Sequence, residues 1–132
     1  MKPTIKIGNE ITLEFTVTDG MRPTFHNKVI HPVCSTWDLA HQFEIAARLT
    51  LEPHLEMNEQ GIGTHLSINH LKPLQVRRTV LVKATIVDLD TSTVVCELVA
   101  LIDGEICAEG KQIQRVLPAN KIKQIIQLGS ED

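Results

Sequence analysis

The fold is decided by residues 35–55, which read STWDLAHQFEIAARLTLEPHL. Ser35 is a suitable N-cap, and Asp38 three residues later completes a capping-box pattern, so we expect a helix to begin at Thr36. Mostly small side chains recur at intervals of three and four and predict a narrow buried stripe on this helix: Leu39, Ala40, Phe43, Ala46, Ala47 and Thr50. We expect the helix to end near Leu55, because Pro53 and the polar residues that follow stop it.

The segments on both sides of this helix have the alternating pattern of β-strands. One strand is expected before the helix, at residues 11–17, and residues 18–33 are interpreted as irregular. Four more strands are expected after the helix, at residues 62–71, 78–90, 93–102 and 105–117. Asp103-Gly104 is a strong hairpin signal between the last two strands. A short final helix is expected at residues 120–128.

This order of elements predicts a single α+β domain over residues 1–132, in which one long helix lies on one face of an antiparallel sheet. Strands of this length twist, so the sheet should curve around the helix. Its edge strands would expose unpaired backbone groups, which pair readily with a second copy of the chain. Dimerisation is therefore a physical expectation.

Composition and charge narrow the class of protein. The chain has 132 residues, of which 42% are hydrophobic and 22% charged, and this is typical of a soluble globular domain. A formal net charge of -3 argues against a nucleic-acid partner that is bound by phosphate neutralisation. No apolar run approaches the ~20 residues that cross a bilayer. The N-terminus also lacks the apolar core of a signal peptide, so no membrane partner is expected.

The cysteine pattern indicates a reducing compartment. Cys34, Cys96 and Cys107 are odd in number and form no CxxC pair, so a cytoplasmic location is the simplest interpretation. Cys96 and Cys107 are interpreted as small core residues. A metal site is not expected, and no cofactor is expected either.

The strand GTHLSINH at residues 63–70 carries the first candidate for chemistry. Alternation places Leu66, Ile68 and His70 on one face, and it places His65 on the opposite, solvated face. His70 thus ends an apolar row. Taken alone, it is either a core histidine bonded to a backbone carbonyl or a functional imidazole.

Two helix residues complete a candidate set. Glu44 lies among apolar neighbours, so it either points to water or is a buried carboxylate. Thr36 is either an ordinary first-turn residue or a hydroxyl placed beside the unpaired N–H groups of a helix start, which suit an oxyanion. Together, a hydroxyl, a carboxylate and an imidazole supply a nucleophile or water-positioning group, and a base with its orienting partner.

Three segments carry a resemblance to a known family: PVCST at residues 32–36, FEIAA at residues 43–47, and GTHLSINHLKP at residues 63–73. They resemble the fluoroacetyl-CoA thioesterase-like family of hot-dog proteins. That family shows a threonine at the helix start, a glutamate eight residues later, and a strand that begins with Gly-Thr and ends in histidine. The resemblance covers roughly residues 10–117, and all three spacings hold without a gap.

The resemblance implies a hot-dog fold, with a long central helix wrapped by a curved antiparallel sheet. It implies hydrolysis of a small or medium acyl-CoA thioester to the acid and free CoA, with Thr36, Glu44 and His70 as the catalytic triad. Gly63 matches the glycine that lets substrate approach the strand backbone, and Arg115 matches an arginine near the site on the last strand. Candidate cations for the CoA phosphates are Lys72, Arg77, Arg78 and Lys111.

The chain departs from the family pattern at three places. Ile113 stands where the last strand usually carries a histidine, and VRR at residues 76–78 replaces an expected glycine after Pro73. The lid before the helix is shorter, and its aromatic residue is replaced near Ile30. Because that lid is associated with fluoroacetyl selectivity, fluoroacetyl-CoA is not the expected substrate.

Helix geometry constrains the triad. Eight helical residues span ~12 Å of rise, so Thr36 and Glu44 of one helix should not touch. A site assembled between two subunits, in a homodimer or a dimer of dimers, relieves this difficulty.

Two alternative functions stay open from the sequence. A non-catalytic acyl-CoA or metabolite-binding hot-dog module is favoured by Ile113 and the altered loop. An acyl-CoA hydratase is disfavoured because those enzymes typically pair Asp and His at a spacing that this chain lacks.

Overall fold

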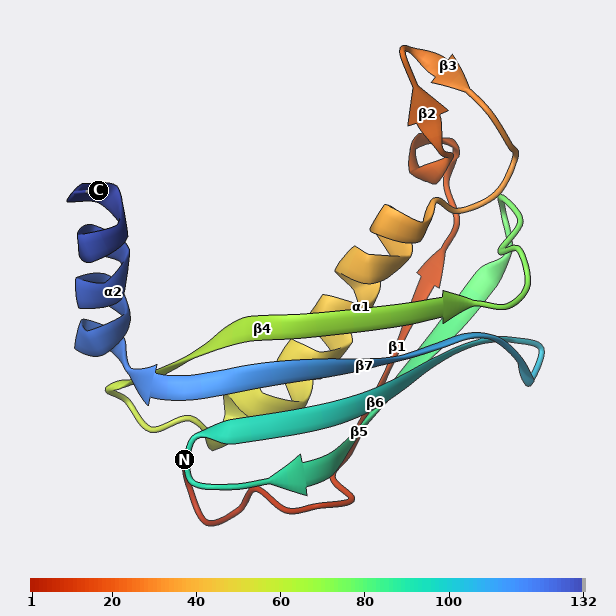
Figure 1. Cartoon of the computed structure of the whole chain (residues 1–132). Helices are drawn as coiled ribbons and strands as arrows, with labels where there is room; N and C mark the ends of the chain where they lie inside the picture. Colours follow the sequence, from red (N-terminus) through yellow and green to blue (C-terminus); the bar gives the residue numbers. More distant parts are fainter. Residues whose placement is uncertain (132) are drawn as a thin grey trace.

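The computed structural model describes residues 1–131 (Figure 1). Its main elements are β1 (Glu10–Thr16), α1 (Thr36–Leu51), β4 (Glu59–His70), β5 (Thr79–Leu89), β6 (Thr93–Ile102), β7 (Glu105–Pro118) and α2 (Ala119–Glu131). Between β1 and α1 lie a 3-10 turn, η1 (Asp19–Met21), and a small hairpin of β2 (Thr24–Phe25) and β3 (Lys28–Val29). A second 3-10 turn, η2 (Glu52–His54), follows α1.

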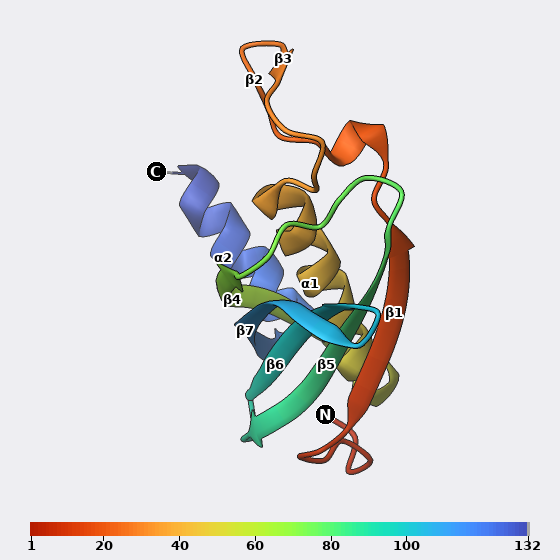
Figure 2. The ribbon, with the colours of Figure 1, turned by 90° about the vertical axis from the view of Figure 1, so that its right-hand side faces the viewer.

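Five strands form one antiparallel sheet in the order β1-β5-β6-β7-β4. Helix α1 packs against one face of this curved sheet, mainly on β5, β4 and β1 (Figure 2). The predicted α+β arrangement is therefore confirmed. The strand order differs from the order along the chain, because β4 pairs with β7 and so becomes an edge of the sheet.

Helix α1 begins where the sequence predicts. The side chain of Ser35 caps it, because its Oγ accepts a hydrogen bond from the backbone N–H of Asp38 at 3.2 Å and its hydroxyl donates to the Asp38 carboxylate at 2.7 Å. The regular helix ends at Leu51 rather than near Leu55, and η2 continues the chain as a tighter turn. Pro53 has no N–H to donate, so the α-helical ladder cannot run through it.

The core lies between α1 and the concave face of the sheet. Five of the six predicted stripe residues are buried, whereas Ala40 is only partly covered. Ala46 and Ala47 have small side chains that let the helix approach the sheet closely, and both are fully buried. All three cysteines are buried and free, which confirms Cys96 and Cys107 as core residues.

Strand β4 contains a bulge that changes which residues face the helix. Its pairing with β7 shifts register between Gly63 and His65, so Thr64 is the extra residue. Before the bulge Gly63 faces α1, and after it Leu66, Ile68 and His70 do. Simple alternation predicts the second set correctly, but it would place Gly63 on the opposite face. The bulge therefore brings Gly63 and His70 to the same side of the sheet.

Two tight hairpins use residues in the left-handed region. Asp103 has φ 49° and Gly104 has φ 79°, and together they turn β6 into β7 as predicted. His26 has φ 52° and Asn27 has φ 65°, and they connect β2 to β3. The interpretation of residues 18–33 as irregular was wrong here. The two strands are each two residues long and exposed, so they leave no alternating pattern to recognise.

The loop between β4 and β5 carries one strained residue. Arg77 has φ 71°, a conformation that favours glycine. It lies in the segment VRR at residues 76–78, which stands where the resemblance leads us to expect a glycine. The N–H of Arg77 donates to the carbonyl of Val17 at 2.7 Å, which ties the loop to the segment after β1.

The final helix, α2, is longer than the predicted residues 120–128. It packs weakly on β7 and β4 and leaves Ile125, Ile126 and Leu128 exposed. Among residues 1–131, no helix is long and apolar enough to cross a membrane.

Candidate active site

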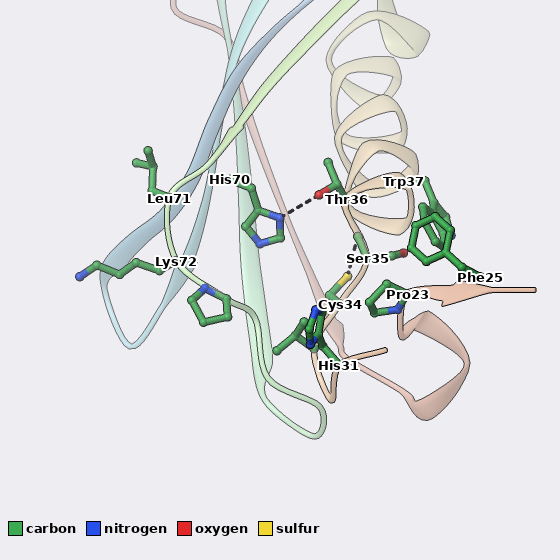
Figure 3. A pocket seen from close by; sticks show the side chains of 12 residues that line it. Pro23, Phe25, His31, Cys34, Ser35, Thr36, Trp37, His70, Leu71 and Lys72 are labelled. Atoms are coloured by element: carbon green, nitrogen blue, oxygen red, sulfur yellow. Dashed lines mark hydrogen bonds between the residues drawn. The ribbon is translucent and has the colours of Figure 1, made fainter. Parts of the chain in front are cut away.

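The first residue of α1 meets the last residue of β4. Oγ1 of Thr36 lies 3.2 Å from Nδ1 of His70, within hydrogen-bond distance (Figure 3). The Ser35 cap fixes the position of Thr36, and the β4 bulge turns His70 toward the helix. The structure thus brings together two of the three residues predicted for the triad.

The start of α1 offers free hydrogen-bond donors beside this pair. The N–H of Asp38 is taken by Ser35 Oγ and the N–H of Leu39 by the carbonyl of Ser35. Within the described residues, the N–H groups of Thr36 and Trp37 have no acceptor. Helix starts also carry a positive dipole end, so these two groups suit a carbonyl oxygen that gains negative charge.

A surface pocket of about 500 Å³ opens over the Thr36–His70 pair. The N-terminus of α1, the end of β4 and the β2–β3 hairpin line it. Its walls are largely apolar and include Pro23, Phe25, Trp37 and Leu71. The rings of Phe25 and Trp37 meet edge to face, with centroids 5.6 Å apart, and each residue is about half exposed. The pocket is therefore a concave, mainly apolar site with a few polar groups at its base, as expected for a small-ligand site.

His70 is held in the uncharged form. Burial lowers the pKa of its imidazole below the ordinary value of 6.5, and a weaker interaction with the Lys72 backbone opposes this shift. A neutral imidazole accepts a proton, which is what a general base must do. Its Nε2 atom is buried and has no hydrogen-bond partner among the described residues.

Glu44 lies apart from this pair within one chain. Its Oε2 accepts a hydrogen bond of 2.9 Å from Nε2 of Gln112, and it sits over Gly63. A methyl group on Gly63 would lie 3.2 Å from the same oxygen. Glu44 is half-buried, so it is neither fully solvated nor enclosed. The prediction that Thr36 and Glu44 of one helix do not touch agrees with these separate partners.

Helix α1 and strand β4 run antiparallel, and three contacts mark their alignment. Thr36 meets His70, Glu44 meets Gly63, and Nη1 of Arg48 donates to the carbonyl of Gly61 at 3.0 Å. Thr36 with His70 and Glu44 with Gly63 are therefore two separate contacts between α1 and β4.

Of the remaining predicted residues, Lys72 lines the pocket, whereas Arg115, Arg77, Arg78 and Lys111 do not. Arg115 is exposed on β7, between the buried residues Gln114 and Val116, so it belongs to the face turned away from α1. Among the candidate cations, Lys72 pairs with Glu105 and Arg78 pairs with Asp103. Lys111 is exposed on the same outer face of β7, and Arg77 is exposed on its loop.

Sequence reasoning missed Gln112 and the aromatic pair of the pocket. Gln112 lies at a position where alternation on β7 predicts an apolar residue, and a polar residue on a buried face is the signal that could have found it. Phe25 lies in the segment interpreted as irregular, and nothing in the spacing connects it with Trp37.

The comparison with protein families decides the relationship. Residues 17–120 match the model of the family described as fluoroacetyl-CoA-specific thioesterase. The chain belongs to this family. No curated protein sequence matches it.

Solved structures share the fold of this thioesterase family member. A hypothetical protein of Thermus thermophilus, described as a thioesterase superfamily member, is 27% identical over 98% of this chain and 96% of its own, with a TM-score of 0.92. A point mutant of the fluoroacetyl-CoA-specific thioesterase is 18% identical over 97% and 99%, with a TM-score of 0.86. A hot-dog-like protein of Thermanaerovibrio acidaminovorans is 17% identical over 96% and 91%, with a TM-score of 0.85.

The hot-dog fold implied by the resemblance is therefore confirmed. Family membership also makes the chain a thioester hydrolase, and the non-catalytic alternative is set aside.

Proposed function

We propose that this thioesterase hydrolyses a small or medium acyl-CoA to the acid and free CoA, using Thr36, His70 and Glu44. The observation that carries the proposal is the 3.2 Å contact between Thr36 Oγ1 and His70 Nδ1 at the base of the pocket. The related fluoroacetyl-CoA thioesterase has been solved with acetyl-CoA and, separately, with fluoroacetate and CoA. We extend the acyl-CoA class to this chain, but not the fluoroacetyl group, because the lid differs.

The proposed reaction follows from the geometry. The thioester carbonyl oxygen accepts hydrogen bonds from the N–H groups of Thr36 and Trp37, which stabilise the negative charge of the tetrahedral intermediate. Neutral His70 takes the proton of the attacking group, either water or the Thr36 hydroxyl. The imidazolium then returns this proton to the departing CoA sulfur, which leaves as the thiol. If Thr36 is the nucleophile, a second round with water releases the acid.

We further propose that the active enzyme is a homodimer or a dimer of dimers formed at the edge of β4. This strand is twelve residues long, and no other described strand pairs with its outer edge. A two-fold axis would pair two copies antiparallel. Centred on Ser67, and with Thr64 as the extra residue in each copy, the pairing places Gly63 of one protomer opposite His70 of the other. Because Glu44 lies over Gly63 of its own chain, this register would bring the Glu44 carboxylate of the partner subunit toward His70 as the partner of its imidazole.

Subunit exchange tests this arrangement. We expect His70→Ala and Glu44→Ala to be nearly inactive as separate homodimers. After denaturation and refolding together, half of the dimers are mixed and each contains one intact site, so about a quarter of wild-type activity returns. If each triad lies within one protomer, the mixture stays inactive.

Activity itself is tested with a panel of short and medium acyl-CoAs, with free thiol as the readout. Release of no thiol from any of them would remove the proposal. In the same panel, Arg115→Ala tests the substrate contact that the resemblance implies. Gly63→Ala tests whether the glycine next to the Glu44 carboxylate is needed for activity. We expect a raised KM for Arg115→Ala if this side chain contacts CoA.

We place the enzyme in the cytoplasm, because three free, buried thiols suit a reducing compartment.

A further inference from the structure

The Glu44 carboxylate is held by an amide that comes from the sheet. Gln112 lies on the inward face of β7 and is 1% exposed. Its Nε2 donates to Oε2 of Glu44 at 2.9 Å, across the interface between α1 and β7. A methyl group on Gly63 would lie 3.2 Å from that oxygen and 3.3 Å from Nε2 of Gln112. The carboxylate is therefore located by three elements together: α1, β7 and the bare backbone of β4.

Packing does not explain a glutamine at this position. Its Oε1 atom is buried and has no partner among the described residues. A buried, unpartnered amide oxygen disfavours folding, and an apolar side chain of the same shape would avoid this cost. The amide is thus retained in the core for the one hydrogen bond that it donates.

The charge of Glu44 sets the orientation of this amide. If the amide were turned over, its oxygen would face a carboxylate oxygen, and two acceptors repel. The nearest cation on the same helix, Arg48, is engaged by the carbonyl of Gly61 and by the side chains of Gln60 and Glu52. In the described part of the chain, Gln112 is the one donor to the Glu44 carboxylate.

We propose that Gln112 is a positioning residue, which fixes the Glu44 carboxylate for thioester hydrolysis. This inference rests on the proposed role of Glu44 in that reaction. With Oε2 bound to the amide, rotation of the carboxylate is restricted and Oε1 keeps a constant direction. Gln112 does not line the pocket over Thr36 and His70, so it acts through Glu44 and not on the substrate.

The next inward residue of β7 supplies a matched control. Gln114 is also buried, at 2% exposure, but its Nε2 donates to the carbonyl of Ala47 at 3.1 Å. It ties the sheet to the helix backbone and touches no residue of the proposed triad. Gln112→Met and Gln114→Met therefore remove the same chemical group, one bound to Glu44 and the other to the backbone.

The test compares kcat, KM and thermal stability of these variants. For Gln112→Met we expect kcat to fall about tenfold, because a small displacement of a catalytic group is costly, with KM unchanged. Its melting temperature should be equal to or above that of the wild type. For Gln114→Met we expect a lower melting temperature and an unchanged kcat per folded molecule. A role of Gln112 in stability alone predicts the opposite pattern.

Two further readouts separate positioning from structure. In a Glu44→Ala background, Gln112→Met should cause no additional loss, because residues that act as a unit are not additive. In Gln112→Glu, the introduced carboxyl group donates to Glu44 only when protonated. Its activity relative to wild type should therefore recover as pH is lowered.

An NMR measurement tests the contact without turnover. The side-chain amide signal of Gln112 should move in Glu44→Ala and stay in place in Arg115→Ala. An unmoved signal in Glu44→Ala would overturn the inference, as would a wild-type kcat in Gln112→Met. If Glu44→Ala is as active as the wild type, the proposed function of Glu44 fails as well. If Glu44→Ala is inactive and Gln112→Met is fully active, only the inference fails.

Discussion

Replacing Gly63 with alanine is the smallest change that reaches the Glu44 carboxylate. The added methyl group would lie 3.2 Å from Oε2 of Glu44 and 3.3 Å from Nε2 of Gln112, where ordinary contacts are 3.4–4 Å. Both neighbours are ends of flexible side chains, so each can move by the few tenths of an ångström that relieve the contact. The backbone need not move.

The expected effects on stability and activity are different. In a strand interior, alanine is favoured over glycine by about 0.5–1 kcal/mol, and this offsets the small steric strain, so the free energy of unfolding should change by less than about 1 kcal/mol. A catalytic group misplaced by about 1 Å costs up to about 100-fold in rate, so a shift of a few tenths should lower kcat about three- to tenfold.

Gly61→Ala is the matched control, two residues earlier on the same face. Its methyl group would lie 2.7 Å from Cδ2 of Leu51, which is fully buried, so we expect a loss of about 1–3 kcal/mol of stability from overpacking. Because it does not touch Glu44, its kcat per folded molecule should equal the wild-type value. Urea unfolding gives the free energy of unfolding of both variants, and thiol-release kinetics give their kcat values.

One result would refute this reasoning directly. If Gly63→Ala keeps the wild-type kcat while its stability is unchanged, the position of the Glu44 carboxylate does not matter for hydrolysis. If Gly63→Ala loses stability as Gly61→Ala does, Gly63 is needed for packing and not for positioning the Glu44 carboxylate.

Three further outcomes follow from local features. Arg77→Gly should raise the free energy of unfolding by about 1 kcal/mol, because φ 71° strains an arginine. A lower free energy of unfolding, measured with urea, would show instead that the arginine side chain stabilises the fold. Burial lowers the pKa of His70, so the acid limb of kcat/KM should lie below pH 6.5. For the same reason the contribution of His70 to the free energy of unfolding is fully present above pH 6.5 and is lost as pH falls through the folded-state pKa, and this dependence should be absent in His70→Asn. A limb above pH 6.5 would contradict this. Burial, assisted by nearby Asp38, raises the pKa of the Cys34 thiol to about 11, so native protein at pH 8 should resist alkylation at Cys34 that unfolded protein undergoes; rapid labelling would disprove it.

Local signals predicted the elements, and tertiary pairing decided their arrangement. The Ser35 cap located the start of α1, and Asp103-Gly104 located the last hairpin, because both depend on residues adjacent in the chain. The pairing of β4 with β7 was not predictable in the same way. It depends on contacts between residues far apart in sequence, such as Gly63 with Gln114, for which alternation carries no information.

The candidate site likewise contains some residues that the sequence predicted and others that only the tertiary structure brings together. The spacing of Thr36 and His70 in matching elements identified a pair that the structure places in contact. Gln112 could not be paired with Glu44 from the sequence, because their meeting depends on how α1 lies across the sheet. That Gly63 lets substrate approach the strand backbone stays a prediction, and the structure adds that the Glu44 carboxylate lies next to this glycine.

The bulge at Thr64 has a consequence for how sequences of this kind should be aligned. Gly63 and His70 are separated by an odd number of positions, and two residues at an odd separation share a face only if the strand contains one extra residue. A related chain that lacks a residue between its glycine and its histidine would need no bulge to keep both inward, and one with the same spacing must have it. Deleting Thr64 should therefore be tolerated better than deleting any single residue from 65 to 69, because it removes the unpaired residue and leaves the inward row from Leu66 to His70 intact.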